Sequence, residues 1–351
     1  MTITINKKEY SLHTLDTGAQ ELSKKRWDSI AKPLHSLGKM EDLVIQTAGI
    51  TGDANVTYDK KALIVMCADN GVVAEGVTQS EQNVTAIVSE NFLSDKATVA
   101  ILCKQTGAEI FPIDIGIAVD TKLENHKIAY GTKNMAKEPA MTREEAERAM
   151  EVGIEKVREL SEQGYKIIAT GEMGIGNTTT SSALASYFLQ EDVEKMTGRG
   201  AGLTSKALEK KIAVVRKAIA DYSPAFTDAI DALAALGGFD IAGMAGVFLG
   251  GAIYRVPIIM DGFISSTAAL TATRICPACK NFIMASHVSK EPAAEKILAA
   301  MDKEAALHCD MCLGEGTGAV TLFPILDLAI QIYEQMSTFE DIEIDAYVEL
   351  K

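Results

Sequence analysis

YKIIATGEMGIGNTTTSSAL, at residues 165–184, is the stretch from which the fold can be predicted. An apolar, partly β-branched run leads into Gly171, Gly174 and Gly176, and a row of small hydroxyl residues then opens a helix. This order predicts a strand, a loop and a helix, whose free N–H groups converge and suit an anion such as a phosphate. A tight turn that uses glycine only for its conformation gives the same pattern, so that alternative stays open.

Apolar runs of strand length alternate with helical patterns on both sides of this stretch. The predicted strands are Lys61–Ala68, Glu109–Ile117, Val256–Met260 and Phe282–Ala285. The predicted helices include residues 81–105, 141–163, 205–221, 291–307 and about 319–336. The alternation predicts an α/β fold with a doubly wound, mostly parallel sheet and helices on both faces. Such sheets bind ligands beyond the carboxyl ends of their strands, where the polar loops then meet.

The two ends of the chain predict a smaller, helical part. Residues 11–50 are polar with helical periodicity, and Lys32-Pro33 marks a break between two helical pieces. We expect a large α/β domain at residues 40–290. Residues 1–39 and 291–351 are expected to form a small helical domain.

Composition excludes several classes of function. The formal net charge of -14 over 351 residues argues against nucleic acid, which requires a basic surface. The most apolar region, residues 229–260, is interrupted by Asp231, Asp240, Arg255 and Pro257, so no membrane span is expected. The first ten residues alternate polar and apolar side chains without a signal-peptide core, and we expect a cytoplasmic protein.

Glu315 is the most informative single residue of the C-terminal part. It stands between Gly314 and Gly316 at the start of a predicted helix, where packing gives no reason for a carboxylate. The helix N-terminus is expected to hold it ionised and able to accept a proton; the alternative is a charge that only complements the helix dipole. Glu172 has the same character beside the predicted phosphate loop. Two such carboxylates suggest one general base and one group that positions a sugar hydroxyl.

Six blocks, taken in order, resemble the signature sequences of nicotinate-nucleotide:dimethylbenzimidazole phosphoribosyltransferase. They are ADNGV with EGV (68–77), GEMGIGNTT (171–179), GGFD (237–240), DGFIS (261–265), SH (286–287) and LGEGTG (313–318). The resemblance implies transfer of 5-phosphoribosyl from nicotinate mononucleotide to an aromatic base, with inversion at the anomeric carbon, in the assembly of the lower ligand of cobamides. It implies small-molecule substrates, no cofactor and no metal.

The resemblance also implies roles for particular residues. Glu315 is expected to be the general base, and Glu172 is the second catalytic carboxylate. Matching positions assign donor and phosphate binding to Gly174, Ile175, Gly176, Asn177, Lys211 and Ser289. They assign acceptor binding to Ser80, Val88 and Leu313. Without the resemblance, Lys211 is one of several lysines on a helix face that solvent would cover.

Departures from the family pattern leave the acceptor open. Asn70 stands where many members have His, and Glu81 replaces a frequent Pro. Val88 occupies a position where some members place a Gln, so hydrogen-bonding capacity is lost there. A benzimidazole, a purine and a phenol attacked through oxygen all remain possible. Some relatives that use phenols are heterodimers of similar chains, so a homodimer is expected with a heterodimer as the alternative.

The sequence also allows two rival functions and one rival site. A nicotinamide-dependent dehydrogenase lacks support because no G-x-G-x-x-G follows the first strand. A non-catalytic partner subunit is disfavoured because both glutamates are present. The pairs Cys276/Cys279 and Cys309/Cys312 have a spacing that zinc sites use, with His308 as an extra ligand. We favour small core-facing residues, and we expect the second pair on a helix.

Overall fold

A parallel six-stranded sheet lies at the centre of the computed structural model, which describes residues 1–200 and 202–348. The strands follow the order β5-β4-β3-β6-β7-β8, and each neighbouring pair is parallel. Their bounds are β3 (Lys61–Ala68), β4 (Ala108–Gly116), β5 (Glu124–Asn125), β6 (Ile167–Met173), β7 (Ile258–Met260) and β8 (Ile283–Ala285). The predicted mostly parallel sheet is confirmed.

Strand β3 shows why its sequence is an unbroken apolar run. It pairs with β4 on one side and β6 on the other, and every one of its residues is buried. A strand in the middle of a sheet that helices cover on both faces has no side for polar residues. The carboxyl ends of β3, β4, β6, β7 and β8 consequently lie at the same edge of the sheet.

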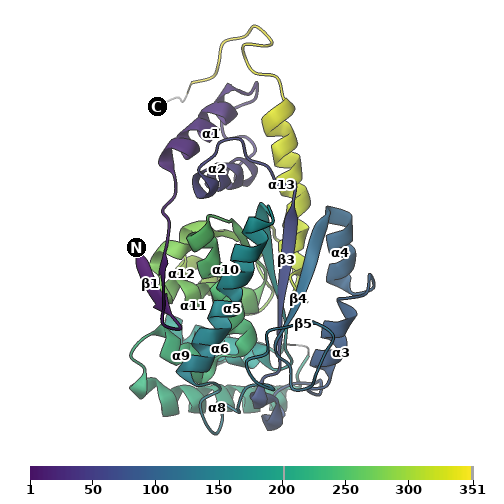
Figure 1. Ribbon diagram of the computed structural model, residues 1–351, viewed down its shortest axis with the longest axis vertical. Coiled ribbons are helices and arrows are strands. Elements are labelled where there is room, and N and C mark those ends of the chain that lie inside the picture. Colours follow the sequence, from purple (N-terminus) through teal and green to yellow (C-terminus); the bar gives the residue numbers. More distant parts are fainter. Residues whose placement is uncertain (201, 349–351) are drawn as a thin grey trace.

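Helices cover both faces of the sheet (Figure 1). On one face, α10 (Phe239–Tyr254) packs against β3, β4 and β6, with α5 (Arg143–Glu162) and α11 (Phe263–Ile275) beside it. On the other, α4 (Thr98–Thr106) packs against β4 and α13 (Thr317–Gln335) against β6. Between β6 and α10 the chain also forms the helices α6 (Asn177–Leu189), α7 (Val193–Met196), α8 (Ser205–Tyr222) and α9 (Ala229–Leu236).

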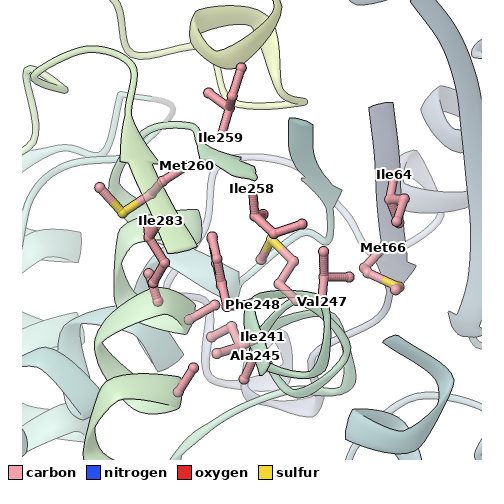
Figure 2. Close-up of a cluster of buried hydrophobic side chains, with 14 of the residues drawn as sticks. Ile64, Met66, Ile241, Ala245, Val247, Phe248, Ile258, Ile259, Met260 and Ile283 are labelled. Carbon is pink, nitrogen blue, oxygen red and sulfur yellow. The ribbon is translucent and has the colours of Figure 1, made fainter. Parts of the chain in front are cut away.

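The small residues of α10 allow its close approach to α5. A Cβ on Gly153 would lie 2.0 Å from the carbonyl oxygen of Gly243, and one on Gly246 would lie 2.0 Å from that of Met150. Larger side chains at these positions would force the helices apart. On its sheet-facing side α10 contributes apolar side chains, including Val247 and Phe248, to the core with residues of β3, β7 and β8 (Figure 2).

The N-terminal and C-terminal segments meet at one end of the molecule (Figure 1). A hairpin of β1 (Thr2–Ile5) and β2 (Lys8–Ser11) precedes α1 (Thr17–Ser29) and α2 (Lys39–Thr51). The rings of Trp27 in α1 and Tyr333 in α13 lie 5.0 Å apart. The predicted break between two helical pieces falls between α1 and α2.

The predicted helix at residues 81–105 is two helices, α3 (Val84–Asn91) and α4. The side chain of Ser94 donates a hydrogen bond to the carbonyl oxygen of Asn91 at 2.8 Å. Such side-chain bonds to the backbone compete with helix continuation. Apolar periodicity alone gave no sign of this interruption.

The predicted helix at residues 291–307 is confined to α12 (Ala294–Ala300). Asp302 has a left-handed φ of 52°, and the chain turns away at that point. The prediction of a helix around Cys309 and Cys312 is wrong, because these residues lie in irregular backbone and Asp310 has a φ of 51°. None of the helices within residues 1–200 and 202–348 has the length and apolarity needed to cross a membrane.

Candidate active site

A cavity of about 340 Å³ opens at the carboxyl edge of the sheet. Loops that follow β3, β6, β7 and β8 line it, together with the segment before α13. Ten of the predicted site residues border this one cavity: Ser80, Val88, Glu172, Gly174, Ile175, Gly176, Asn177, Ser289, Leu313 and Glu315. A volume of this size is sufficient for a small ligand.

The predicted phosphate loop is shorter than the sequence suggested. Strand β6 continues to Met173, so Gly171 and Glu172 belong to the strand and only residues 174–176 connect it to α6. Gly176 is the N-cap of α6 with a φ of 97°, and no side chain caps the helix. The first turn of a helix carries N–H groups without partners inside the helix, which makes this end suitable for an anion.

Lys211 of α8 lies directly behind this helix start. Its side chain is 1% exposed, and its Nζ donates to the Thr178 hydroxyl at 2.8 Å and to the carbonyl oxygen of Gly198 at 3.3 Å. Burial lowers the pKa of Lys211 to about 8, although the charge of Glu291 acts in the opposite direction. The structure thus places a buried cation, held by neutral groups, beside the N-terminus of α6.

Glu172 and Asp240 form a pair of buried carboxyl groups. The Nδ2 atom of Asn177 donates to both, to Oδ2 of Asp240 at 3.1 Å and to Oε2 of Glu172. Burial, and then the nearby charge of Asp240, raise the pKa of Glu172 to about 8. Burial also raises the pKa of Asp240 to about 6. Two such neighbours resist ionising together, and Glu172 is the one that retains a proton at neutral pH.

Glu315 lies in the segment that packs against the end of β6. A Cβ on Gly171 would lie only 2.4 Å from the carbonyl oxygen of Glu315, so β6 and the Glu315 loop are in direct contact. The backbone N–H of Glu315 donates to Oε1 of Glu172 at 3.4 Å. The structure therefore brings the carboxylate of Glu172 against the backbone of Glu315, 143 positions later in the sequence, and both residues line the same cavity.

The electrostatic setting of Glu315 differs from the sequence expectation. The helix N-terminus was expected to hold the carboxylate ionised, which corresponds to a lowered pKa. Instead, partial burial and then the charge of Asp261 raise the pKa of Glu315. The residue precedes the N-cap Gly316, outside the helix, and the neighbouring carboxylate outweighs the dipole. Glu315 is consequently a stronger proton acceptor than an ordinary glutamate.

The remaining wall of the cavity is largely apolar. Val77, Val88 and Ile175 line it, and Phe263 and Leu313 border it on the side of the Glu315 segment. Leu313 is 56% exposed, so it lies at the rim. This wall matches the flat aromatic surface of a base better than a polar sugar or peptide.

Sequence reasoning assigned no role to two acidic residues of this site. Asp240 lies behind Glu172, and Asp261 follows β7 and lines the cavity. Both belong to sequence blocks that were recognised, and the position of Asp261 after a predicted strand was a usable signal. His287 has its Nδ1 3.9 Å from Oδ1 of Asp261.

The cysteine pairs do not assemble into one cluster. Cys276 and Cys279 are buried, whereas Cys309 and Cys312 are exposed, and all are free thiols. Within residues 1–200 and 202–348, no group of three or more His, Cys, Asp or Glu side chains is arranged to hold a metal ion. The zinc alternative therefore has no support in this geometry.

An anion-binding helix start that faces a pair of carboxylates is an arrangement suited to the transfer of a phosphorylated sugar. A family model described as phosphoribosyltransferase matches residues 12–344, and the chain belongs to this family.

Its relatives bear a more specific name, nicotinate-nucleotide–dimethylbenzimidazole phosphoribosyltransferase. The chain is 49% identical to the protein of that name from Acetivibrio thermocellus, over 93% of this chain and 94% of the relative. It is 49% identical to the one from Clostridium acetobutylicum, over 97% of each. The crystal structure of CobT from Thermus thermophilus superposes with a TM-score of 0.89, at 33% identity, over 93% of this chain and 99% of that chain. The resemblance found in the signature blocks is confirmed, and the dehydrogenase alternative is wrong.

Proposed function

We propose that this chain transfers the 5-phosphoribosyl group of nicotinate mononucleotide to 5,6-dimethylbenzimidazole or a related aromatic base. The products are nicotinate and an α-ribotide, which serves as the lower ligand in cobamide assembly. The observation that carries the proposal is the placement of Glu315 and Glu172 in one cavity with the uncapped start of α6. Names of relatives at 49% identity support the same reaction.

The donor phosphate is proposed to bind at the start of α6. Backbone N–H groups of residues 174–177 would approach its oxygens, and the ammonium of Lys211 would supply the compensating charge. Ser289 and Arg199 line the same cavity and complete a polar end. Holding the phosphate here fixes the ribose carbon beside the carboxylates, so that much of the entropic barrier to transfer is removed on binding.

The chemistry then needs one proton acceptor. A nitrogen of the base attacks C1′ of the ribose from the face opposite nicotinate, and the bond between C1′ and the pyridine nitrogen breaks. Nicotinate leaves with the bonding electron pair, and the N–H proton of the base passes to the Glu315 carboxylate. Glu172, which retains its proton at neutral pH, is proposed to orient a ribose hydroxyl.

The acceptor base is proposed to bind along the apolar wall of the cavity. Val88 offers an isopropyl group to the cavity and no hydrogen bond, and Ser80 is a polar residue of the same segment that lines the cavity. A purine, or a phenol attacking through oxygen, is the second candidate for the same chemistry, because the apolar wall does not select for a second ring nitrogen.

The proposal is tested by incubating the purified chain with nicotinate mononucleotide and a panel of benzimidazoles, purines and phenols. Chromatography should show nicotinate release that depends on the acceptor, together with a ribotide of matching mass. Absence of nicotinate release with every acceptor, from protein that is folded and binds the donor, would contradict the assignment.

The domain organisation and the oligomeric state are also proposed. We propose a small domain of residues 1–39 and 291–351 beside a large one of 40–290, supported by the contact between α1 and α13. A cytoplasmic homodimer is proposed, with a heterodimer of similar chains as the alternative. The exposed side chains of Ile87 and Leu93, 63% and 55% accessible, offer an apolar surface for a second chain. Light scattering of the purified protein measures the assembly.

A further inference from the structure

The segment that carries Glu315 has an unusual backbone. Gly314, Glu315 and Gly316 all have positive φ, at 87°, 63° and 90°. A left-handed conformation is accessible to glycine, but it is unfavourable for a glutamate and persists only where surrounding contacts hold it. The question is which groups hold this one in place.

Asp261 provides the strongest of these contacts. Its Oδ2 accepts a hydrogen bond from the backbone N–H of Gly316 at 3.2 Å, and its Oδ1 accepts one from that of Ala319 at 2.9 Å. Both bonds are buried, and Asp261 is 3% exposed. Helix α13 has no side-chain cap of its own at Gly316, so Asp261 caps it from a position 55 residues earlier.

The backbone of Asp261 is itself held in place by a hydrogen bond. Its backbone N–H donates to the hydroxyl of Ser265 at 3.1 Å, and that hydroxyl lies 2.7 Å from the hydroxyl of Thr170 in β6. Asp261 therefore connects three elements: its carboxylate bonds to the start of α13, and its backbone N–H is linked through Ser265 of α11 to β6. A small shift of its side chain would be transmitted to Gly316, the residue next to Glu315.

The charges around Glu315 come from several elements. Glu172 of β6 lies against its backbone, with Asp240 of α10 behind, and Asp261 lies on the far side. His287 after β8 approaches Asp261, and Arg199 and Glu291 line the more distant part of the cavity. The named neighbours of Glu315 are thus mainly acidic, and Asp261 is the one whose charge acts on it.

We propose that Asp261 is a positioning residue for the transfer reaction. It binds the backbone that follows Glu315 and places a negative charge beside the Glu315 carboxylate. The inference rests on the proposed function, in which Glu315 takes the proton. Asp261 does not touch the substrates in this role. It holds a strained base at the cavity and keeps that base from ionising at low pH.

The variant Asp261→Asn removes the charge while keeping the shape of the side chain. Loss of a neighbouring negative charge lowers the pKa of Glu315, so the acid limb of the kcat/KM profile should move down by about one pH unit. At the optimum, kcat should fall by about 10-fold to 100-fold because the loop is held by one good contact instead of two. Donor binding, measured by calorimetry, should change little.

Two control variants separate charge from position. Asp310→Asn removes an exposed carboxylate from the same chain segment and should leave both kcat and the acid limb unchanged. Thr317→Val removes a neutral bond, from the Thr317 hydroxyl to the carbonyl oxygen of Gly314 at 2.8 Å, without altering charge. It should lower kcat and leave the acid limb where it is.

An unshifted acid limb in a folded Asp261→Asn enzyme would overturn the inference while leaving the proposed function intact. Failure of the proposed function shows itself separately, as absence of nicotinate release by the unmodified chain. Should Asp261→Asn not fold, the Glu315 carboxyl can be titrated in the unmodified protein by ¹³C NMR, with Glu315→Gln identifying its resonance. A pKa at or below the ordinary glutamate value would overturn the inference.

Discussion

Charged side chains are arranged in opposite ways at the cavity and along helix α5. On α5 and its surroundings they are paired: Lys156 lies 2.7 Å from Glu124, and Arg143 lies 2.8 Å from Asp228 and 2.7 Å from Asp231. A hydrogen bond from His126, followed by the contact with Lys156, lowers the pKa of Glu124 to about 2. These carboxylates are ionised at all ordinary pH values.

At the cavity, three buried ionisable side chains are held by neutral groups instead. Among the described residues, Glu172, Asp240 and Lys211 form no ion pair, and the groups that bind them are amides, hydroxyls and backbone atoms. Each pKa is displaced toward the neutral form. A pair that neutralised itself would leave nothing for a substrate to bind, so unpaired buried charge marks the functional end of the molecule.

Among tests of the contrast between paired and unpaired charges, the largest effect is expected on the donor KM when Lys211 is replaced. Lys211→Met should raise the KM for nicotinate mononucleotide by about 100-fold, because the buried positive charge that is proposed to compensate the donor phosphate is lost. Since the pKa of Lys211 is about 8, the donor KM of the unmodified enzyme should also rise above that pH. Lys210→Met, at the exposed neighbouring position, is the matched control and should leave KM unchanged. Equal effects of both variants would show that Lys211 is an ordinary surface lysine.

A second effect concerns stability at Glu172. Its pKa is raised to about 8 in the folded protein, so the stability it contributes is present below its ordinary pKa and is lost as pH rises through 8. Glu172→Gln does not titrate, and relative to the unmodified protein it should gain about 4 kcal/mol of unfolding free energy between pH 5 and pH 9. Urea unfolding at those values measures the gain.

Glu124→Gln, at the β5 residue that pairs with Lys156 of α5, is the counterpart among the paired charges. A carboxylate with a lowered pKa contributes stability above its ordinary pKa and loses it as pH falls toward 2. This variant should therefore be less stable than the unmodified protein at pH 7, with the difference disappearing under acid conditions. Parallel pH dependence for the two variants would remove the distinction between the two regions.

A smaller effect is expected from Arg143, which joins α5 to the N-terminus of α9. Its side chain is 42% exposed, so Arg143→Met should cost about 0.5 kcal/mol of unfolding free energy at pH 7. Because its partner Asp228 has a lowered pKa, the cost should vanish as pH falls below the ordinary aspartate value. The kcat should be unchanged, and a fall in kcat would mean that the paired charges also serve the reaction.

The smallest effect concerns acceptor choice. Val88→Gln should change the ratio of kcat/KM values for a benzimidazole and a phenol by about 10-fold, because an amide at the apolar wall favours acceptors that can hydrogen-bond. Ile87→Gln, at the adjacent exposed position, should leave the ratio unchanged. An identical ratio in all three enzymes would place acceptor selection elsewhere in the cavity.

Local sequence was sufficient for much of the fold. The apolar run at Lys61–Ala68 is strand β3 with the same bounds, and the helix predicted at residues 141–163 is α5, which begins with a capping box of Thr142 and Glu145. These features depend on residues close together in the chain, where periodicity and capping rules apply. The prediction missed the interruption between α3 and α4 because apolar periodicity does not register a side-chain bond to the backbone such as that of Ser94.

The site was predictable only in part, because some of its contacts join residues that lie far apart in the sequence. Glycines and carboxylates after strands identified the cavity, and ten predicted residues line it. The role of Asp261 depends on bonds to Gly316 and Ala319, 55 and 58 positions away, which no local pattern contains. The raised pKa of Glu315 likewise arises from burial and from a distant carboxylate.

The central claim is that Glu315 accepts the proton while a separate set of groups holds the donor. Glu315→Gln tests it most directly, with donor affinity measured by calorimetry and nicotinate release measured under saturating donor. The account predicts a donor Kd within about twofold of the unmodified enzyme and a kcat lowered by at least about 100-fold. Loss of donor affinity in proportion to the loss of kcat would contradict it and make Glu315 a structural residue.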